Sequence, residues 1–318
     1  MTDWPNHAEA WRQWRDAMSS ERMHHGWLLA GKAGLGKRDF AEAAALALVA
    51  EPGVAQPAGE HPDILTLSYG PKDDKAERAA ADGKPFDLAR SIRIKQIRAM
   101  QKRLITRPTL GSKRAIIIDP ADDMEKAAAN ALLKSLEEPP AGTFFLLVTH
   151  RPARLLPTIR SRCRTLRFPV LTDSQLSAML GEAGLASDPQ AIAAAEGSFG
   201  AAVRFAKQDL APIARIVAGL LAVGDSGMTG RGELARLIGP RADRERLQAV
   251  LELAQSLTAH AARTAQDPER RMQLVDIHAS LVRLAGEAPT ANFDASLLPF
   301  EIGSLLVTAA PASAAAHG

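Results

Sequence analysis

A glycine-rich octapeptide near the N-terminus limits the possible folds more than any other part of the sequence. Residues 31–38 read Gly-Lys-Ala-Gly-Leu-Gly-Lys-Arg and match the phosphate-loop pattern at every position but the last. The apolar run Trp27–Ala30 predicts a buried strand before it, and the alanine-rich segment Asp39–Ala50 predicts a helix after it. In this context the loop can point backbone N–H groups at phosphates, and its lysine can reach their outer oxygens. The candidate nucleotide-binding residues are Gly31, Gly34, Gly36, Lys37 and, on a later strand, Asp119.

Two groups that support ATP hydrolysis are missing. The last loop position should carry a hydroxyl that binds Mg²⁺, but it carries Arg38, whose guanidinium cannot ligate a metal. The run Ala115–Ile118 predicts a strand ending in Asp119, a carboxylate that could hold Mg²⁺ directly or through water. The next residue is Pro120, which has no acceptor to orient an attacking water. We expect slow or no turnover, weak ATP or ADP binding at most, and no required cofactor; a glycine turn that binds nothing is the alternative.

The order of apolar runs and helical patterns predicts an α/β domain followed by helices. Up to Phe168, short apolar runs alternate with amphipathic helices, which indicates a parallel sheet with helices on both faces. After Pro169 only helical patterns follow, and Thr172 or Asp173 suits the N-cap of the first. The charged segment Tyr69–Asp87 predicts a loop or mobile insertion. The expected strands are Trp27–Ala30, Asp63–Ser68, Ala115–Ile118, Phe144–Thr149 and Thr165–Phe168, with helices that include Ile94–Leu104 and Glu125–Glu138.

Positive charge is concentrated in two tracts of the expected α/β domain. Nine Lys or Arg and no acidic residue lie between Leu88 and Arg114, and six Arg and no acidic residue lie between Pro139 and Thr172. Such tracts fit a polyanion such as nucleic acid. A solvated helix face with a coincidental arginine cluster explains them equally well.

Cellular location and metal content can also be predicted. No apolar run is long enough to span a bilayer, and the stretch Met1–Glu21 has no apolar signal core. We therefore expect a cytoplasmic chain without membrane contact. The only cysteine is Cys163, which excludes an internal disulfide and a multi-cysteine zinc site.

Two longer segments carry a family resemblance. Residues 130–140 read Asn-Ala-Leu-Leu-Lys-Ser-Leu-Glu-Glu-Pro-Pro, and residues 155–163 read Leu-Leu-Pro-Thr-Ile-Arg-Ser-Arg-Cys. With the glycine loop they closely resemble the AAA+ clamp-loader family of DNA replication, strongly over Trp27–Phe168 and by general pattern beyond it. The resemblance implies a RecA-like AAA+ domain over residues 1–168, a helical lid over 169–208 and an all-α, oligomerising collar over 209–318.

The resemblance also implies a function. In the family, AAA+ subunits of bacterial DNA polymerase III form an open ring that uses ATP to open the sliding clamp and place it on primed DNA. This chain looks most like the subunit that does not drive hydrolysis. Arg38 and Pro120 agree with that role, and Gly200 stands where motor subunits carry a phosphate-sensing arginine. The implied partners are the gamma/tau motor subunits, the delta subunit, the sliding clamp and, through the complex, primer-template DNA. An ATP-hydrolysing motor subunit of the same family is the alternative.

The resemblance implies a catalytic role for Arg162. In the family, the arginine of this Ser-Arg-Cys segment projects into the ATP site of a neighbouring subunit, where it stabilises charge on the transferring phosphoryl group. A surface salt bridge is the alternative for Arg162, and Arg160 is a weaker candidate for a supporting role.

A metal site is not expected. Many relatives carry a four-cysteine zinc module in the place of Ala50–His61, where this chain has no cysteine, so we expect no zinc. The adjacent His24 and His25 lack an evident third ligand and are expected to be structural or exposed.

Overall fold

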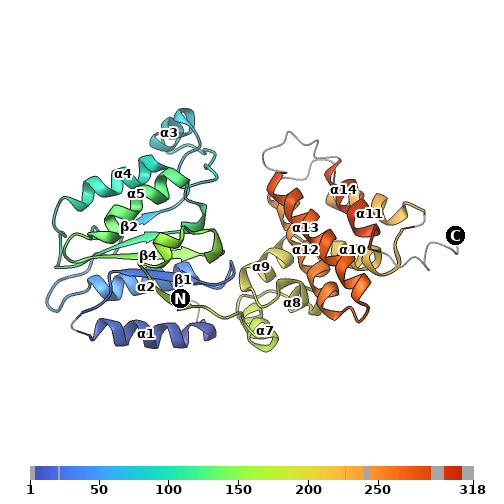
Figure 1. Ribbon diagram of the computed structural model, residues 1–318, viewed down its shortest axis with the longest axis horizontal. Helices are drawn as coiled ribbons and strands as arrows, with labels where there is room; N and C mark the ends of the chain where they lie inside the picture. Colours follow the sequence, from blue (N-terminus) through green and yellow to red (C-terminus); the bar gives the residue numbers. More distant parts are fainter. Residues whose placement is uncertain (1–3, 21, 226, 240–243, 288–296, 310–318) are drawn as a thin grey trace. The chain divides into compact units, whose positions relative to one another are not determined.

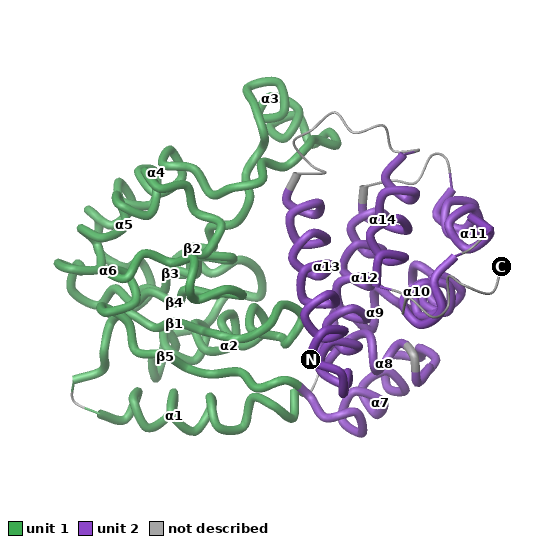
Figure 2. Tube along the Cα trace, turned by 45° about the vertical axis from the view of Figure 1, so that its right-hand side comes forward, with its two compact units in different colours: residues 1–170 green, residues 171–318 purple. Residues whose placement is uncertain are grey.

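The computed structural model describes residues 4–20, 22–225, 227–239, 244–287 and 297–309. The chain divides into two compact units, Met1–Val170 and Leu171–Gly318, which are coloured separately in Figure 2. The first unit is an α/β domain, and the described part of the second is helical (Figure 1). The predicted α/β fold class, a parallel sheet with flanking helices followed by a helical C-terminal region, is therefore confirmed.

Five parallel strands form the sheet of the first unit, in the order β2-β3-β4-β1-β5. Each predicted strand is present within one residue of its expected ends. The central strands are almost entirely buried, as expected for a parallel sheet covered on both faces. The strands are β1 Gly26–Ala30, β2 Ile64–Leu67, β3 Arg114–Ile118, β4 Thr143–Thr149 and β5 Arg164–Arg167.

Helices cover the two faces of this sheet. Because successive strand residues point to opposite faces, each central strand contributes to two buried clusters. Leu29 and Ile117 pack with α1 and α2, whereas Leu28 and Ile116 pack with α4 and α5 (Figure 1). These helices are α1 Ala8–Met18, α2 Lys37–Val49, α4 Ile94–Leu104 and α5 Lys126–Glu137. Shorter helical segments are η1 Pro5–His7, η2 Ala121–Asp123, η3 Pro152–Arg154 and α6 Pro157–Arg160.

The register of the parallel strands determines which loops meet. Ala30 pairs with Thr149, and Leu67 pairs with Ile118, so the segments after β1, β3 and β4 leave the sheet at one edge, here called the carboxyl edge. The strands begin at the opposite, amino edge, where Trp27 pairs with Arg164. The candidate site residues are distributed between these two edges.

The segment Tyr69–Asp87 differs from its prediction as a loop or mobile insertion, because it contains the helix α3 Asp74–Ala81. Asp73 caps this helix by accepting a hydrogen bond from the backbone N–H of Ala76, and the alanines within it favour helix. Lys95 of α4 forms an ion pair with Glu77 of α3 at 2.7 Å. Charge and glycine content alone did not reveal this cap and tether.

One buried apolar cluster joins the described helices of the second unit that lie between residues 189 and 307. Phe205, Val217 and Leu281 all belong to it. The first helix of the unit begins after its N-cap Thr172, whose hydroxyl and backbone N–H both bond Gln175, so that prediction is confirmed. No described helix has the length and apolar character that crossing a membrane requires. The described helices are α7 Asp173–Glu182, α8 Pro189–Ala195, α9 Phe199–Lys207, α10 Ala211–Val223, α11 Thr229–Ile238, α12 Arg244–Thr264, α13 Pro268–Glu287 and α14 Leu298–Val307. The division into a lid over 169–208 and a collar over 209–318 stays a prediction.

Candidate functional site

The glycine loop connects the carboxyl end of β1 to the start of α2. Gly34 and Gly36 have positive φ values of 75° and 71°, a conformation that residues with a Cβ rarely adopt. Gly31 lies against the chain after β5, where a Cβ would come within 2.6 Å of the Phe168 carbonyl oxygen. The predicted glycines are thus required by the backbone of the loop, which brings them to the carboxyl edge together with Lys37.

Lys37 is folded back into its own loop. It is 2% exposed, and its Nζ donates a hydrogen bond to the Lys32 carbonyl oxygen at 2.5 Å. Burial lowers the pKa of Lys37 from 10.5 to about 8, although the negative charge of Asp119 opposes this shift. This hydrogen bond uses one of the three ammonium protons, and the charge of a phosphate at the other two would favour the protonated lysine.

The N-terminal segment covers part of the loop. The Trp4 ring lies so close to Gly36 that a Cβ on this glycine would come within 2.2 Å of it. Trp4 Nε1 donates to Asp39 Oδ2 at 2.9 Å, and His7 Nε2 donates to the Leu35 carbonyl oxygen at 2.8 Å. These residues were not among the predicted site residues, because the N-terminus has no motif and only a polar composition. A tryptophan and a histidine close together in that stretch were the available signal.

Arg38 brings a positive charge to the place of the metal-binding hydroxyl. Its Nε donates to Glu42 Oε1 at 2.9 Å, and this hydrogen bond is the main reason why the pKa of Arg38 is raised. Asp119 follows β3 at the same edge. Burial raises the pKa of Asp119, whereas the positive charges of Arg38 and Lys37 oppose that rise. The positive charges of Arg38 and Lys37 thus already act on the carboxylate that would bind Mg²⁺. The residues present therefore do not fit Mg²⁺.

The next two carboxylates connect loops of the carboxyl edge. Both lie in η2, and Asp122 accepts a hydrogen bond from the backbone N–H of His150 at 2.9 Å. Burial alone would raise the pKa of Asp122, but this hydrogen bond helps to lower it. Asp123 accepts a hydrogen bond from the Tyr69 hydroxyl at 2.6 Å and pairs with Arg151 at 3.1 Å. These contacts favour a structural role for both residues.

Arg162 lies at the amino edge, far from the glycine loop. It lies in the short connection between α6 and β5, and β5 begins beside the start of β1. Its Nη2 forms an ion pair with Glu137 Oε1 at 2.6 Å, and its Nη1 donates to the Thr158 carbonyl oxygen at 2.9 Å. The Arg162 side chain is 34% exposed. Because the glycine loop starts at the other end of β1, the fold does not bring Arg162 to the loop of its own chain.

The residues around Arg162 hold its backbone in place. A Cβ on Gly26 would come within 2.8 Å of the Arg162 carbonyl oxygen, so this glycine permits β1 to approach closely. Burial raises the pKa of Cys163 to about 12, which keeps the thiol protonated and unsuited to nucleophilic attack.

The paired histidines also have structural contacts. Their rings stack at 4.8 Å between centroids, and His25 Nε2 donates to the Leu136 carbonyl oxygen at 2.8 Å. Within the ranges that the structure describes, no three His, Cys, Asp or Glu side chains gather as metal ligands would.

Several cations of the described chain have partners within it. Lys95 pairs with Glu77, and Arg93 donates a hydrogen bond to the Lys72 carbonyl oxygen. Arg204, one helical turn after Gly200, pairs with Glu252 at 2.8 Å. Within the first basic tract, the ion pair of Lys95 with Glu77 reduces the positive charge that can be offered to a polyanion.

Known proteins resemble the first unit most clearly. The family model described as DNA polymerase III, delta subunit, matches residues 6–172. DNA polymerase III subunit delta' of Pseudomonas aeruginosa is 38% identical over 156 residues, which cover 48% of this chain and 46% of that protein. The same subunit of Bacillus subtilis is 35% identical over 167 residues, which cover 49% and 45%. The matches thus span about half the length of these relatives.

A solved structure also shows similarity. A DNA polymerase III gamma subunit-related protein from Thermotoga maritima aligns with a TM-score of 0.48 and 18% identity. The alignment covers 94% of this chain and 98% of that one.

Proposed function

Because the chain belongs to the family described as DNA polymerase III, delta subunit, we propose that it is a non-hydrolysing, delta-prime-type subunit of a bacterial clamp loader. In this role it assembles with the gamma/tau and delta subunits and helps to place the sliding clamp on primer-template DNA. Its similarity to two proteins named subunit delta' supports the assignment.

The observation that carries the non-hydrolysing role is the set of charges around Asp119. Arg38 replaces the hydroxyl that would bind Mg²⁺, and its charge acts on Asp119 together with that of Lys37. Without Mg²⁺ between the β- and γ-phosphates, the charge that develops during phosphoryl transfer is poorly neutralised. The buried ammonium of Lys37 is also already bonded to the loop itself. The loop is therefore suited to weak nucleotide binding at most.

The chemistry of this subunit is assigned to Arg162, acting on the ATP of a neighbouring subunit. Its position at the amino edge, opposite the chain's own loop, supports action in trans. Glu137 holds the guanidinium at 2.6 Å. A partly exposed ion pair of this kind contributes only about 0–1 kcal/mol, so a neighbour's triphosphate can displace Glu137 at little cost.

Arg162→Ala in the reconstituted clamp loader tests this role. We expect the neighbouring site to lose its trans arginine, which contributes ~10³–10⁵ in rate in related systems. The ATPase rate of the complex should fall by the fraction of the total rate that this neighbouring site contributes. Arg12→Ala is the matched control, because it removes an arginine from an exposed ion pair of 2.6 Å on α1. Full ATPase activity of an intact complex with Arg162→Ala would contradict the assignment.

Isothermal calorimetry with ATP tests the loop in the purified chain. We expect weak binding that Mg²⁺ does not strengthen, because Arg38 stands in the place of its ligand, and no release of phosphate. The motor-subunit alternative predicts measurable turnover that Lys37→Ala abolishes. Such turnover would overturn the non-hydrolysing role and leave the family unchanged.

A further inference from the structure

One apolar side chain projects from the surface of the first unit. Ile105 is 86% exposed, more than any other large hydrophobic residue in the described ranges. It directly follows Leu104, the buried last residue of α4. A single exposed apolar residue is common in folded proteins. Ile105 is distinguished by the way in which its loop is held.

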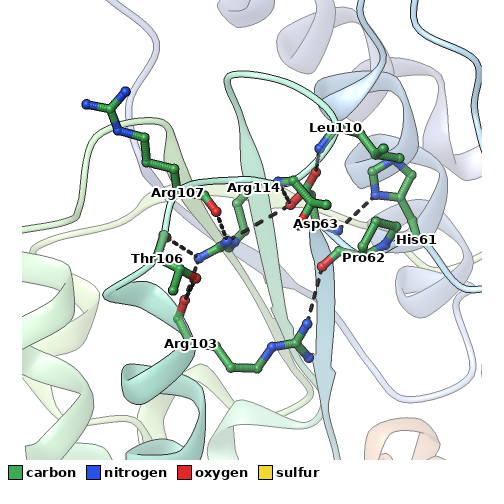
Figure 3. Close-up of polar contacts among 9 residues, drawn as sticks. His61, Pro62, Asp63, Arg103, Thr106, Arg107, Leu110 and Arg114 are labelled. Carbon is green, nitrogen blue, oxygen red and sulfur yellow. Dashed lines mark hydrogen bonds and ion pairs between the residues drawn. The ribbon is translucent and has the colours of Figure 1, made fainter.

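Arg114 fixes the first half of this loop from within. Its Nη1 donates hydrogen bonds to the carbonyl oxygens of Arg103 at 2.8 Å and Thr106 at 3.1 Å, and its Nη2 donates to that of Arg107 at 2.8 Å. Arg114 is buried, and Figure 3 shows the three carbonyls converging on its guanidinium. These carbonyls lie on both sides of Ile105 in the chain. The backbone of Ile105 therefore cannot turn outward without breaking hydrogen bonds to the buried Arg114 side chain.

Asp63 fixes the second half of the loop. Its Oδ1 accepts a hydrogen bond from the backbone N–H of Thr109 at 2.6 Å, and its Oδ2 accepts one from that of Leu110 at 2.8 Å. Asp63 is also buried, and its Oδ1 lies 4.0 Å from Arg114 Nη2. A loop that is already ordered loses little conformational freedom on binding a partner.

Cationic residues flank Ile105 in the sequence. Lys102, Arg103 and Arg107 are exposed, and the Arg107 side chain points away from the buried cluster (Figure 3). No acidic residue lies between Leu88 and Arg114. A rigid apolar projection within a cationic surface is complementary to an apolar pocket with a rim of carboxylates. DNA phosphates would match the cations but not Ile105, which would need a separate apolar contact with the bases.

We propose that the segment from Lys102 to Arg107 is a docking surface for a partner protein. Ile105 enters an apolar pocket of the partner, and Lys102 and Arg107 pair with carboxylates at its rim. Burial of Ile105 supplies affinity, and the cations supply orientation and a faster association rate. The proposal goes beyond the proposed function, and it rests on that function only for the choice of test partners.

Surface plasmon resonance with three probes tests the docking surface. The gamma/tau-type subunit, the delta subunit and the sliding clamp of the same bacterium are immobilised separately, and the whole chain is the analyte. Ile105→Ser should weaken binding to one of them on the order of 10- to 100-fold, because a buried anchor is lost. Ile105→Leu should retain most of the affinity, since it keeps the apolar volume. Leu46→Ser is the control, because it removes a 47% exposed apolar side chain from α2, which covers the other face of the sheet.

Charge reversal separates a protein partner from DNA. Arg107→Glu should weaken the same contact and reduce its dependence on salt. Equal binding of Ile105→Ser and the wild type to every probe would overturn the docking surface and leave the proposed function intact. Failure of the wild type to bind any probe would contradict both. Immobilised primer-template DNA is a fourth probe. If Arg107→Glu lowers only the affinity for this DNA, and Ile105→Ser changes nothing, the cations belong to a DNA contact and the proposal is wrong.

Discussion

At the scale of single residues, the glycine loop shows how a phosphate cradle can persist without its metal. The Arg38 guanidinium and the Lys37 ammonium both act on Asp119, so the positive charge that Mg²⁺ would bring comes from side chains. The lysine is buried with one carbonyl as its hydrogen-bond acceptor, and its pKa is correspondingly low. The folded chain therefore holds a desolvated cation at neutral pH, which lowers its stability.

Lys37→Met should reveal this cost as a difference in pH dependence. The folded-state pKa of about 8 lies below the ordinary value of 10.5, so between these values the unfolded chain binds more protons than the folded chain. The free energy of unfolding of the wild type should rise with pH across this window, by up to about 1.4 kcal/mol per pH unit. The variant lacks this gain. Urea denaturation of both proteins at pH 7.5 and pH 9.5 measures it.

The difference between the two proteins is the informative quantity, because the other titrating groups are common to both. The free energy of unfolding of the wild type minus that of Lys37→Met should rise by about 2 kcal/mol from pH 7.5 to pH 9.5. A difference that stays constant would mean that Lys37 is not desolvated in the folded chain.

At the scale of elements, sequence periodicity predicts individual strands and helices but not the polar contacts that join distant segments. The strands were expected within one residue because each buried strand is a short apolar run between polar turns. The helix α3 was missed, since its Asp73 cap and its Glu77–Lys95 tether lie outside any apolar pattern. The pairing of Asp63 with Arg114 was missed for the same reason. Hydrophobic periodicity does not predict whether a charged residue beside a strand has a buried partner of opposite charge.

Arg114→Met measures how much this buried pair contributes to stability. The change removes the guanidinium that donates hydrogen bonds to three carbonyl oxygens, and it leaves Asp63 buried without its cation. We expect a loss of about 3–5 kcal/mol in the free energy of unfolding, because a buried charge remains uncompensated. Thermal and urea denaturation provide the measurement. Lys102→Met is the matched control on the exposed surface and should stay within about 0.5 kcal/mol of the wild type. Equal stability of the two variants would show that the pair is dispensable.

At the scale of the whole molecule, topology decides what the candidate residues can do together. The family resemblance assigns Arg162 to a neighbour's ATP, but only the strand pairing places it at the amino edge, opposite the glycine loop. The loop itself could be found from eight consecutive residues. The Trp4 contact with Gly36 could not, because it depends on how the N-terminal segment returns over the sheet. Site residues were therefore predictable one by one, and their division between two edges was not.

Separate buried clusters in the two units predict separate unfolding transitions. The second unit packs around its own cluster, in which Leu281 is fully buried, so Leu281→Ala should destabilise that unit by about 2–5 kcal/mol. All four tryptophans lie in the first unit, at positions 4, 11, 14 and 27, so tryptophan fluorescence reports on that unit alone. In Leu281→Ala we expect the far-UV circular dichroism transition to begin at lower urea while the fluorescence midpoint stays in place. An equal shift of both signals would mean that the two units unfold as one cooperative body, because the loss of packing in one would then be felt fully by the other.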